Sequence, residues 1–229
     1  TQQPAERPAA PTSEPATPGL PGWTKVGFGL TVLVAFFLLA ELLLSLAGVE
    51  PVLYDSDPYV GFASHVPLYV EAEGAAEPVM ETAQNKLEFF NPQRFAATKP
   101  DGGYRVFCVG GSTTYGRPYD DATSYCGWLR QMLLSAEPSR PWEVINAGGI
   151  SFASYRVAKL MNELSHYQPD MFIVYSGQNE FLEQRSYGAL LSLPPWVLNL
   201  NATLSGTRTY TAMKSMIDAM QPDSLKQAQ

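Results

Sequence analysis

Apolar residues dominate one uninterrupted stretch near the start of the chain, residues 26–47, with the sequence VGFGLTVLVAFFLLAELLLSLA. As an α-helix this stretch would be about 33 Å long, at about 1.5 Å per residue. The hydrocarbon core of a bilayer is about 30 Å thick, so the pattern predicts one transmembrane helix within residues 23–48. A signal peptide is the alternative, because Ser45-Leu46-Ala47 resembles a cleavage site, but its apolar region would be shorter.

The charges on either side of this stretch predict its orientation. Arg7 and Lys25 precede it, whereas the first basic residue after it is Lys86. Basic residues favour the cytoplasmic side. We therefore expect a helix in the inner membrane of a bacterium, with the N-terminus in the cytoplasm and residues 49–229 in the periplasm. Trp23 is placed to anchor the cytoplasmic interface.

Glu41 interrupts the apolar stretch as its only charged residue. Its carboxyl group either lies near the interface, snorkelling or protonated, or makes a polar contact with a neighbouring membrane subunit. Both alternatives follow from the cost of a charge in lipid.

The segment before the apolar stretch, residues 1–22, is rich in proline. Its six prolines are Pro4, Pro8, Pro11, Pro15, Pro18 and Pro21. This composition predicts an extended, polyproline-like cytoplasmic tail. Such a tail is a disordered leader unless it lies against another surface.

Beyond residue 100 the apolar pattern becomes regular. Residues 49–100 are punctuated by Pro, Gly and Asp and show no sustained period, so we expect an irregular segment in which residues 88–95 form a packed loop. Residues 101–229 alternate short apolar runs with helical patterns, which predicts βαβ units and a parallel sheet covered on both faces. The expected strands cover residues 104–109, 142–146 and 171–175, the last of them buried. The expected helices cover residues 121–134 (with Tyr125, Trp128, Leu129 and Leu133 on one side), 154–165 and 207–220.

Charge and composition narrow the function classes. The chain of 229 residues has 15 basic and 22 acidic residues, and its pI near 4.8 argues against a nucleic-acid partner. Seven acidic residues fall within residues 49–85 and leave 15 against 15 elsewhere. The imbalance therefore belongs to one acidic segment next to the expected membrane helix. We expect these acids to face solvent or a basic surface on a partner.

Each expected strand ends in a glycine-containing turn with small polar residues. The three turns are Gly110-Gly111-Ser112-Thr113, Asn146-Ala147-Gly148-Gly149-Ile150-Ser151 and Ser176-Gly177-Gln178-Asn179. Ligands of parallel α/β sheets bind beyond the carboxyl ends of the strands. A seryl oxygen, backbone N–H groups and an amide are the parts of a nucleophile with an oxyanion hole. Taken singly, each turn is also ordinary helix-capping or loop chemistry.

These three blocks together resemble the SGNH (GDSL-type) hydrolase family of serine esterases and lipases. VGGSTTYG, INAGGIS and YSGQNEF match its nucleophile, glycine and asparagine blocks over residues 103–185, with Gly111 where the family usually has Asp. The resemblance implies an α/β fold of three layers, flavodoxin-like, with a parallel sheet. It also implies Ser112 as nucleophile, and the Ser112 and Gly149 N–H groups with Asn179 as oxyanion donors. The commonest count from Asn146 would instead place the glycine-block donor at Ser151.

The family places its catalytic base in a D-x-x-H motif after the asparagine block, and this sequence has no histidine after Asn179. His65 and His166 are its only histidines, and we expect His166 at the opposite edge of the sheet. Loss of a triad member costs several orders of magnitude in rate. Either the base lies beyond residue 229, or the domain, whose three strands are fewer than the family usually has, is non-catalytic. An unfinished sheet edge would need cover from another chain or from residues 50–100.

We therefore expect a single-pass membrane protein with four parts: a tail (1–22), a transmembrane helix (23–48), an acidic segment (49–100) and an incomplete SGNH-like domain (101–229). Its function is either that of an accessory subunit of a membrane complex, such as a bioenergetic one, or that of an esterase acting on periplasmic esters. The expected partners are the lipid bilayer and other membrane subunits, with an ester substrate only if the domain is active. No cofactor, metal or nucleic acid is expected. Cys108 and Cys126 are expected to be buried thiols, with a disulfide as the alternative.

Overall fold

The computed structural model describes residues 21–63 and 66–220. Most of the predicted proline-rich tail, residues 1–20, lies outside the described residues. The first element is helix α1 (Gly22–Leu46), which is long and apolar enough to cross a membrane. Its span has a mean hydropathy of 2.4 and buries no residue against the rest of the chain. By length and composition, α1 fits either a membrane-spanning helix or a signal sequence.

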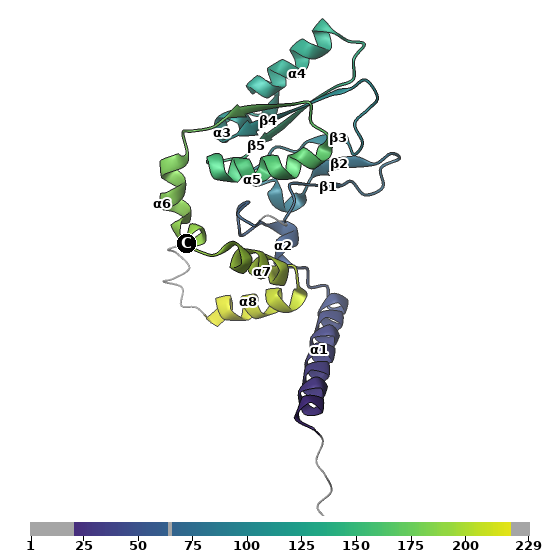
Figure 1. The fold of residues 1–229 in the computed structure, drawn as a ribbon, viewed down its shortest axis with the longest axis vertical. Helices are drawn as coiled ribbons and strands as arrows, with labels where there is room; N and C mark the ends of the chain where they lie inside the picture. The colour runs from purple at the N-terminus through teal and green to yellow at the C-terminus, as the bar shows by residue number, and fades with distance from the viewer. Residues whose placement is uncertain (1–20, 64–65, 221–229) are drawn as a thin grey trace, which may run out of the picture.

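A three-stranded parallel sheet forms the centre of the remaining chain. Its strands are β4 (Tyr104–Gly110), β5 (Trp142–Gly148) and β6 (Met171–Tyr175), in the order β5-β4-β6. Helix α4 (Tyr125–Ala136) covers one face, and α5 (Ser154–Leu164) covers the other (Figure 1). The prediction of an α/β domain with a parallel sheet between helices is therefore confirmed.

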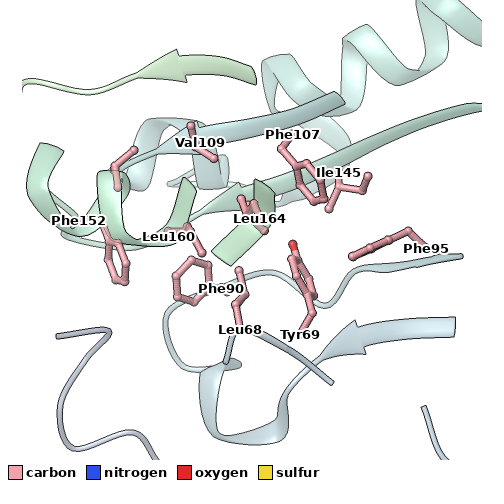
Figure 2. Packing of buried hydrophobic residues seen from close by; sticks show 12 residues of the cluster. Leu68, Tyr69, Phe90, Phe95, Phe107, Val109, Ile145, Phe152, Leu160 and Leu164 are labelled. Carbon is pink, nitrogen blue, oxygen red and sulfur yellow. The ribbon is translucent and has the colours of Figure 1, made fainter. Parts of the chain in front are cut away.

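The larger hydrophobic core lies between this sheet and α5 (Figure 2). It combines residues of the sheet and of α5 with four aromatic or aliphatic side chains from residues 68–95: Leu68, Tyr69, Phe90 and Phe95. The opposite face of the sheet packs on α4 through Tyr125, Leu129 and Leu133. Trp128, predicted on the same side of that helix, is instead 62% exposed.

Residues 49–100 are more ordered than the sequence predicts. They contain helix α2 (Val52–Asp55), the 3₁₀ helix η1 (Gln84–Lys86) and an antiparallel sheet of β1 (Tyr69–Glu71), β2 (Val79–Thr82) and β3 (Arg94–Ala96). The prediction of an irregular segment is wrong here, because strands of three or four residues are too short to establish a period of two.

The C-terminal part of the described chain contains three helices. They are α6 (Glu180–Leu191), α7 (Pro195–Ser205) and α8 (Arg208–Met220). Of these, only α8 was predicted. Figure 1 shows α6 descending from the sheet, while α7 and α8 lie between the α/β layers and α1.

Strand β6 differs from the buried strand predicted at residues 171–175. Met171, Val174 and Tyr175 are 45–53% exposed. The strand lies at the edge of the sheet, and within residues 21–63 and 66–220 nothing pairs with its outer side. Residues 68–96 fold onto the α5 face and beside β5, where the Ala96 N–H donates to Glu143, rather than covering this edge.

Candidate functional site

The ends of the three parallel strands converge as predicted. The Gly149 N–H donates to the Gly110 carbonyl oxygen at 3.0 Å, which joins the turns after β5 and β4. Gln178 Nε2 donates to Thr113 Oγ1 at 3.0 Å, which joins the turns after β6 and β4. The carboxyl ends of β4, β5 and β6 therefore form one candidate site.

Ser112 lies at the centre of this edge, as the first residue of the short helix α3 (Ser112–Tyr115). The residue is half-buried, and within the described part of the chain its hydroxyl group has no hydrogen-bond partner. Two side-chain amides hold α3 at its C-terminal end, because Asn91 and Asn146 both donate to the Tyr115 carbonyl oxygen. Among the described residues, therefore, no group is hydrogen-bonded to Ser112 that could activate it.

Asn179 is buried directly beside the turn that carries Ser112. Its Nδ2 donates to the Phe152 carbonyl oxygen at 2.9 Å. A Cβ atom added at Gly111 would lie 2.5 Å from that Nδ2, closer than non-bonded atoms tolerate. The absence of a side chain at Gly111 therefore makes room for the Asn179 side chain, next to Ser112.

The backbone donor expected at Gly149 is already engaged. Its N–H bond to Gly110 leaves no hydrogen for an oxyanion in this conformation. Ser151, the position given by the alternative count, has a left-handed φ of 64°, which favours glycine. Among the described residues, the Ser151 N–H has no hydrogen-bond partner. The geometry thus favours Ser151 over Gly149 as a backbone donor.

No base reaches Ser112 among residues 21–63 and 66–220. His166 lies in the 3₁₀ helix η3 (Ser165–Tyr167), where its Nδ1 is 3.1 Å from the Glu163 carbonyl oxygen. This helix precedes β6, so His166 is at the amino end of the sheet, opposite to Ser112, as predicted. His65 lies outside the described residues.

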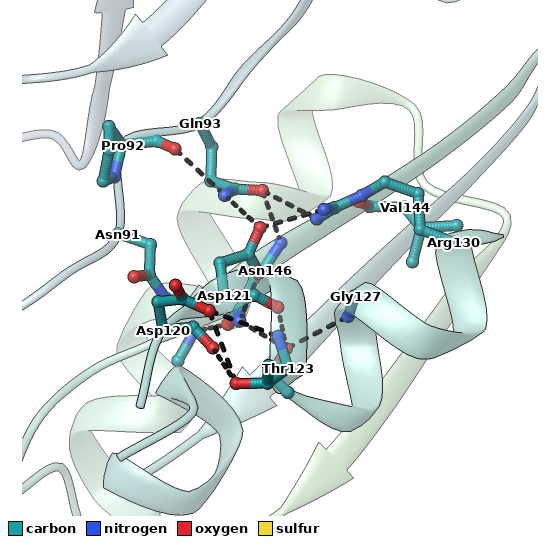
Figure 3. Close-up of polar contacts among 12 residues, drawn as sticks. Asn91, Pro92, Gln93, Asp120, Asp121, Thr123, Gly127, Arg130, Val144 and Asn146 are labelled. Atoms are coloured by element: carbon teal, nitrogen blue, oxygen red, sulfur yellow. Dashed lines mark hydrogen bonds and ion pairs between the residues drawn. The ribbon is translucent and has the colours of Figure 1, made fainter. Parts of the chain in front are cut away.

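A polar network that sequence reasoning missed supports the site from the α4 side (Figure 3). Asp121 accepts hydrogen bonds from Asn146, Arg130 and Gln93. Burial of Asp121 raises the pKa of its carboxyl group, but these three donors outweigh burial and hold the pKa below its usual value. Asn146 also contacts Tyr115, so the network connects α4 and β5 to the helix that carries Ser112.

Neither a cluster of metal-binding side chains nor a disulfide occurs among the described residues. In the part of the chain that the structure describes, no group of three His, Cys, Asp or Glu residues is arranged to hold a metal ion. Cys108 and Cys126 are free and buried, so the expectation of thiols is confirmed over the alternative disulfide.

Glu41 forms its contacts within the chain. Its carboxylate oxygens accept the N–H groups of Arg208 and Thr209, at 3.1 and 2.8 Å. These are the first residues of α8. No neighbouring subunit is needed to explain Glu41, and the predicted contact with one stays a prediction.

Comparison with known proteins adds no information about the site. No protein-family model, curated protein or solved structure matches this chain. The resemblance to SGNH hydrolases therefore depends on the three sequence blocks and on the arrangement of Ser112, Gly111 and Asn179.

Proposed function

We propose that this chain is a single-pass protein of a bacterial inner membrane whose SGNH-like periplasmic domain is non-catalytic and serves as an accessory subunit of a membrane protein complex. In this proposal α1 is the membrane anchor, the N-terminus is cytoplasmic, and the α/β domain presents surfaces to other subunits. The proposal includes a bioenergetic complex as one such assembly.

The observation that carries the proposal is the incomplete chemistry around Ser112. Within the described residues its hydroxyl has no base, and the Gly149 N–H is bound to Gly110. A neutral serine hydroxyl without a base is a weak nucleophile. Asn179 lies against Gly111 and donates to the Phe152 carbonyl oxygen, contacts that stabilise the turn without needing a substrate.

Two further features support a membrane subunit. Helix α1 is tied to the folded domain through Glu41 and α8, which a cleaved signal sequence would not require. Edge strand β6 exposes apolar side chains, and within the described residues nothing pairs with its outer side. Such edges in native proteins are covered or blunted. A partner chain paired with β6 would cover its apolar side chains and bond the backbone groups on its outer side.

Labelling of the membrane-embedded chain with a fluorophosphonate probe tests the proposal. We expect no labelling that depends on Ser112, with S112A as the matched control. Extraction in a mild detergent should also retain a co-purifying membrane partner. Labelling of the wild type that disappears in S112A contradicts a non-catalytic domain, and a monomer after mild extraction contradicts the subunit role.

A serine esterase acting on periplasmic esters is the second candidate. The observation that favours it is the cluster of Ser112 and Asn179 at the carboxyl edge of the sheet, together with the Ser151 N–H after β5, which has no hydrogen-bond partner among the described residues. Its base would have to come from a group outside the described residues. If Ser112 is labelled, loss of labelling in H65A but not in H166A would identify His65 as that base.

A further inference from the structure

Helix α8 has an exposed apolar face that nothing in the described chain covers. Met213, Met216, Ile217 and Met220 are 56–79% exposed, and no residue of α8 is fully buried. On a helical wheel at 100° per residue these four side chains fall within one arc of about 100°. Lys214 and Asp218 lie outside this arc and form an ion pair at 2.8 Å. The helix is therefore amphipathic, with its apolar side turned outward.

The first turn of α8 is fixed to α1. Besides the two bonds to Glu41, Arg208 Nε donates to the Val49 carbonyl oxygen at 3.1 Å. The Val52 N–H donates to Thr211 Oγ1 at 2.9 Å. Figure 1 shows α8 beside the C-terminal end of α1, crossing its direction, with α7 between α8 and the sheet.

The attachment point determines how deep α8 lies. Glu41 is five residues before Leu46, the last residue of α1, which places the first turn of α8 about 8 Å below that end at about 1.5 Å per residue. Interfacial amphipathic helices bury their apolar face about 5–10 Å into the boundary between headgroups and acyl chains. The depth of the first turn of α8 along α1 thus matches that of a helix lying in a membrane interface.

We infer that α8 lies in the outer leaflet of the bilayer, with Met213, Met216, Ile217 and Met220 among the acyl chains. Helix α8 thereby holds the α/β domain at a fixed height and orientation over the membrane. The inference rests on the proposed role of α1 as a membrane anchor. Within it, Glu41 is a positioning residue: it accepts the free N–H groups at the start of α8, which would otherwise lie unpaired in an apolar environment.

The chemistry of α8 points to acyl chains rather than to charged headgroups. The helix has two basic residues, Arg208 and Lys214, and Asp218 pairs with one of them. Its attachment should therefore depend on apolar area and be insensitive to salt and to the share of anionic lipid, unlike a polybasic segment.

Quenching by spin-labelled lipid in nanodiscs of the full chain tests this inference. A fluorophore is attached to M216C, and the lipid is phosphatidylcholine with a doxyl group either near the ester or near the chain end. The control is M132C on α4, where Met132 is 65% exposed against 62% for Met216. We expect the shallow doxyl group to quench M216C at least about twofold more than M132C, as for an interfacial helix. E41L should reduce this quenching.

A label at L38C within α1 separates the possible failures. Quenching of L38C without quenching of M216C places α8 outside the bilayer and overturns the inference, while the membrane anchor stands. If L38C is not quenched either, the proposed membrane function itself fails. Unchanged quenching of M216C in E41L overturns the positioning role of Glu41.

Discussion

The two outer strands of the parallel sheet are both apolar but are packed very differently. In β5, Val144, Ile145 and Ala147 are at most 4% exposed, whereas Val174 and Tyr175 of β6 are 53% exposed. Strand β5 lies between α4, α5 and the antiparallel sheet, while β6 has no neighbour on its outer side among the described residues. An apolar run therefore does not reveal by itself whether its strand is covered by its own chain.

We call β4 and β5 with the elements packed on them the covered half of the domain, and the exposed edge strand β6 the open half. The candidate site lies at the boundary between these two halves. Ser112 follows β4 and Ser151 follows β5, whereas Asn179 follows the exposed strand β6. A partner bound at β6 would therefore contact the element that positions Asn179. This juxtaposition connects the incomplete chemistry of the site to the proposed role as a subunit.

The largest expected effect is on the free energy of unfolding, and it distinguishes two phenylalanines that pair across the boundary. Phe107 in β4 is fully buried and faces Phe172 in β6. F107A should lower the free energy of unfolding by about 3–5 kcal/mol, because it leaves a cavity in a packed core. F172A should cost about 1–2 kcal/mol, since its side chain is only half-buried. Urea unfolding of the full chain in nanodiscs measures both, and equal costs would contradict the division into covered and open halves.

The second expected effect concerns the contact across the boundary at the site. G111A places a methyl group against Asn179 Nδ2 and should cost about 1–3 kcal/mol by overpacking. In an N179A background the same substitution should cost about 1 kcal/mol less, because the side chain in conflict is gone. Urea unfolding of the wild type, G111A, N179A and the double variant measures this coupling. Additive costs would mean that Gly111 and Asn179 do not depend on each other.

Much of the covered half could be predicted from the sequence, because β4, β5 and α5 are long enough for their periods to show. The convergence of the three strand ends followed from the parallel topology. The strands β1–β3 could not be found, since three or four residues define no period. The engagement of the Gly149 N–H was also hidden, because it depends on the approach of two turns separated by about forty positions. Nor could the exposure of β6 be read from its composition, because exposure depends on what packs against it.

A third prediction concerns acid stability of the covered half. The pKa of Asp121 is held below its usual value in the folded protein because its hydrogen-bond donors outweigh burial. The contribution of Asp121 is therefore complete above about pH 4, the value in an unfolded chain, and is lost as the pH falls through the lower folded pKa. We expect D121N to be less stable than the wild type at pH 7, with a difference that shrinks toward pH 3.

The control for this prediction is the exposed carboxylate of Asp101. D101N should differ little from the wild type at either pH, because surface substitutions away from such networks change stability by about 0.5 kcal/mol or less. A constant difference between D121N and the wild type from pH 7 to pH 3 would show that the charge of Asp121 is unimportant.

The smallest energetic effect gives the most direct view of the open half. V174C should change stability by no more than about 0.5 kcal/mol, because the side chain is exposed. Its thiol should react with a maleimide at once, whereas the native thiols should react only on unfolding. Cys126 is buried, and its hydrogen bond to Cys108 together with burial raises the pKa of its thiol, which disfavours the reactive thiolate. Slow labelling of V174C in the purified chain would mean that β6 is covered after all. Fast labelling of the purified chain combined with protection in intact membranes would place the partner subunit on β6, beside Asn179.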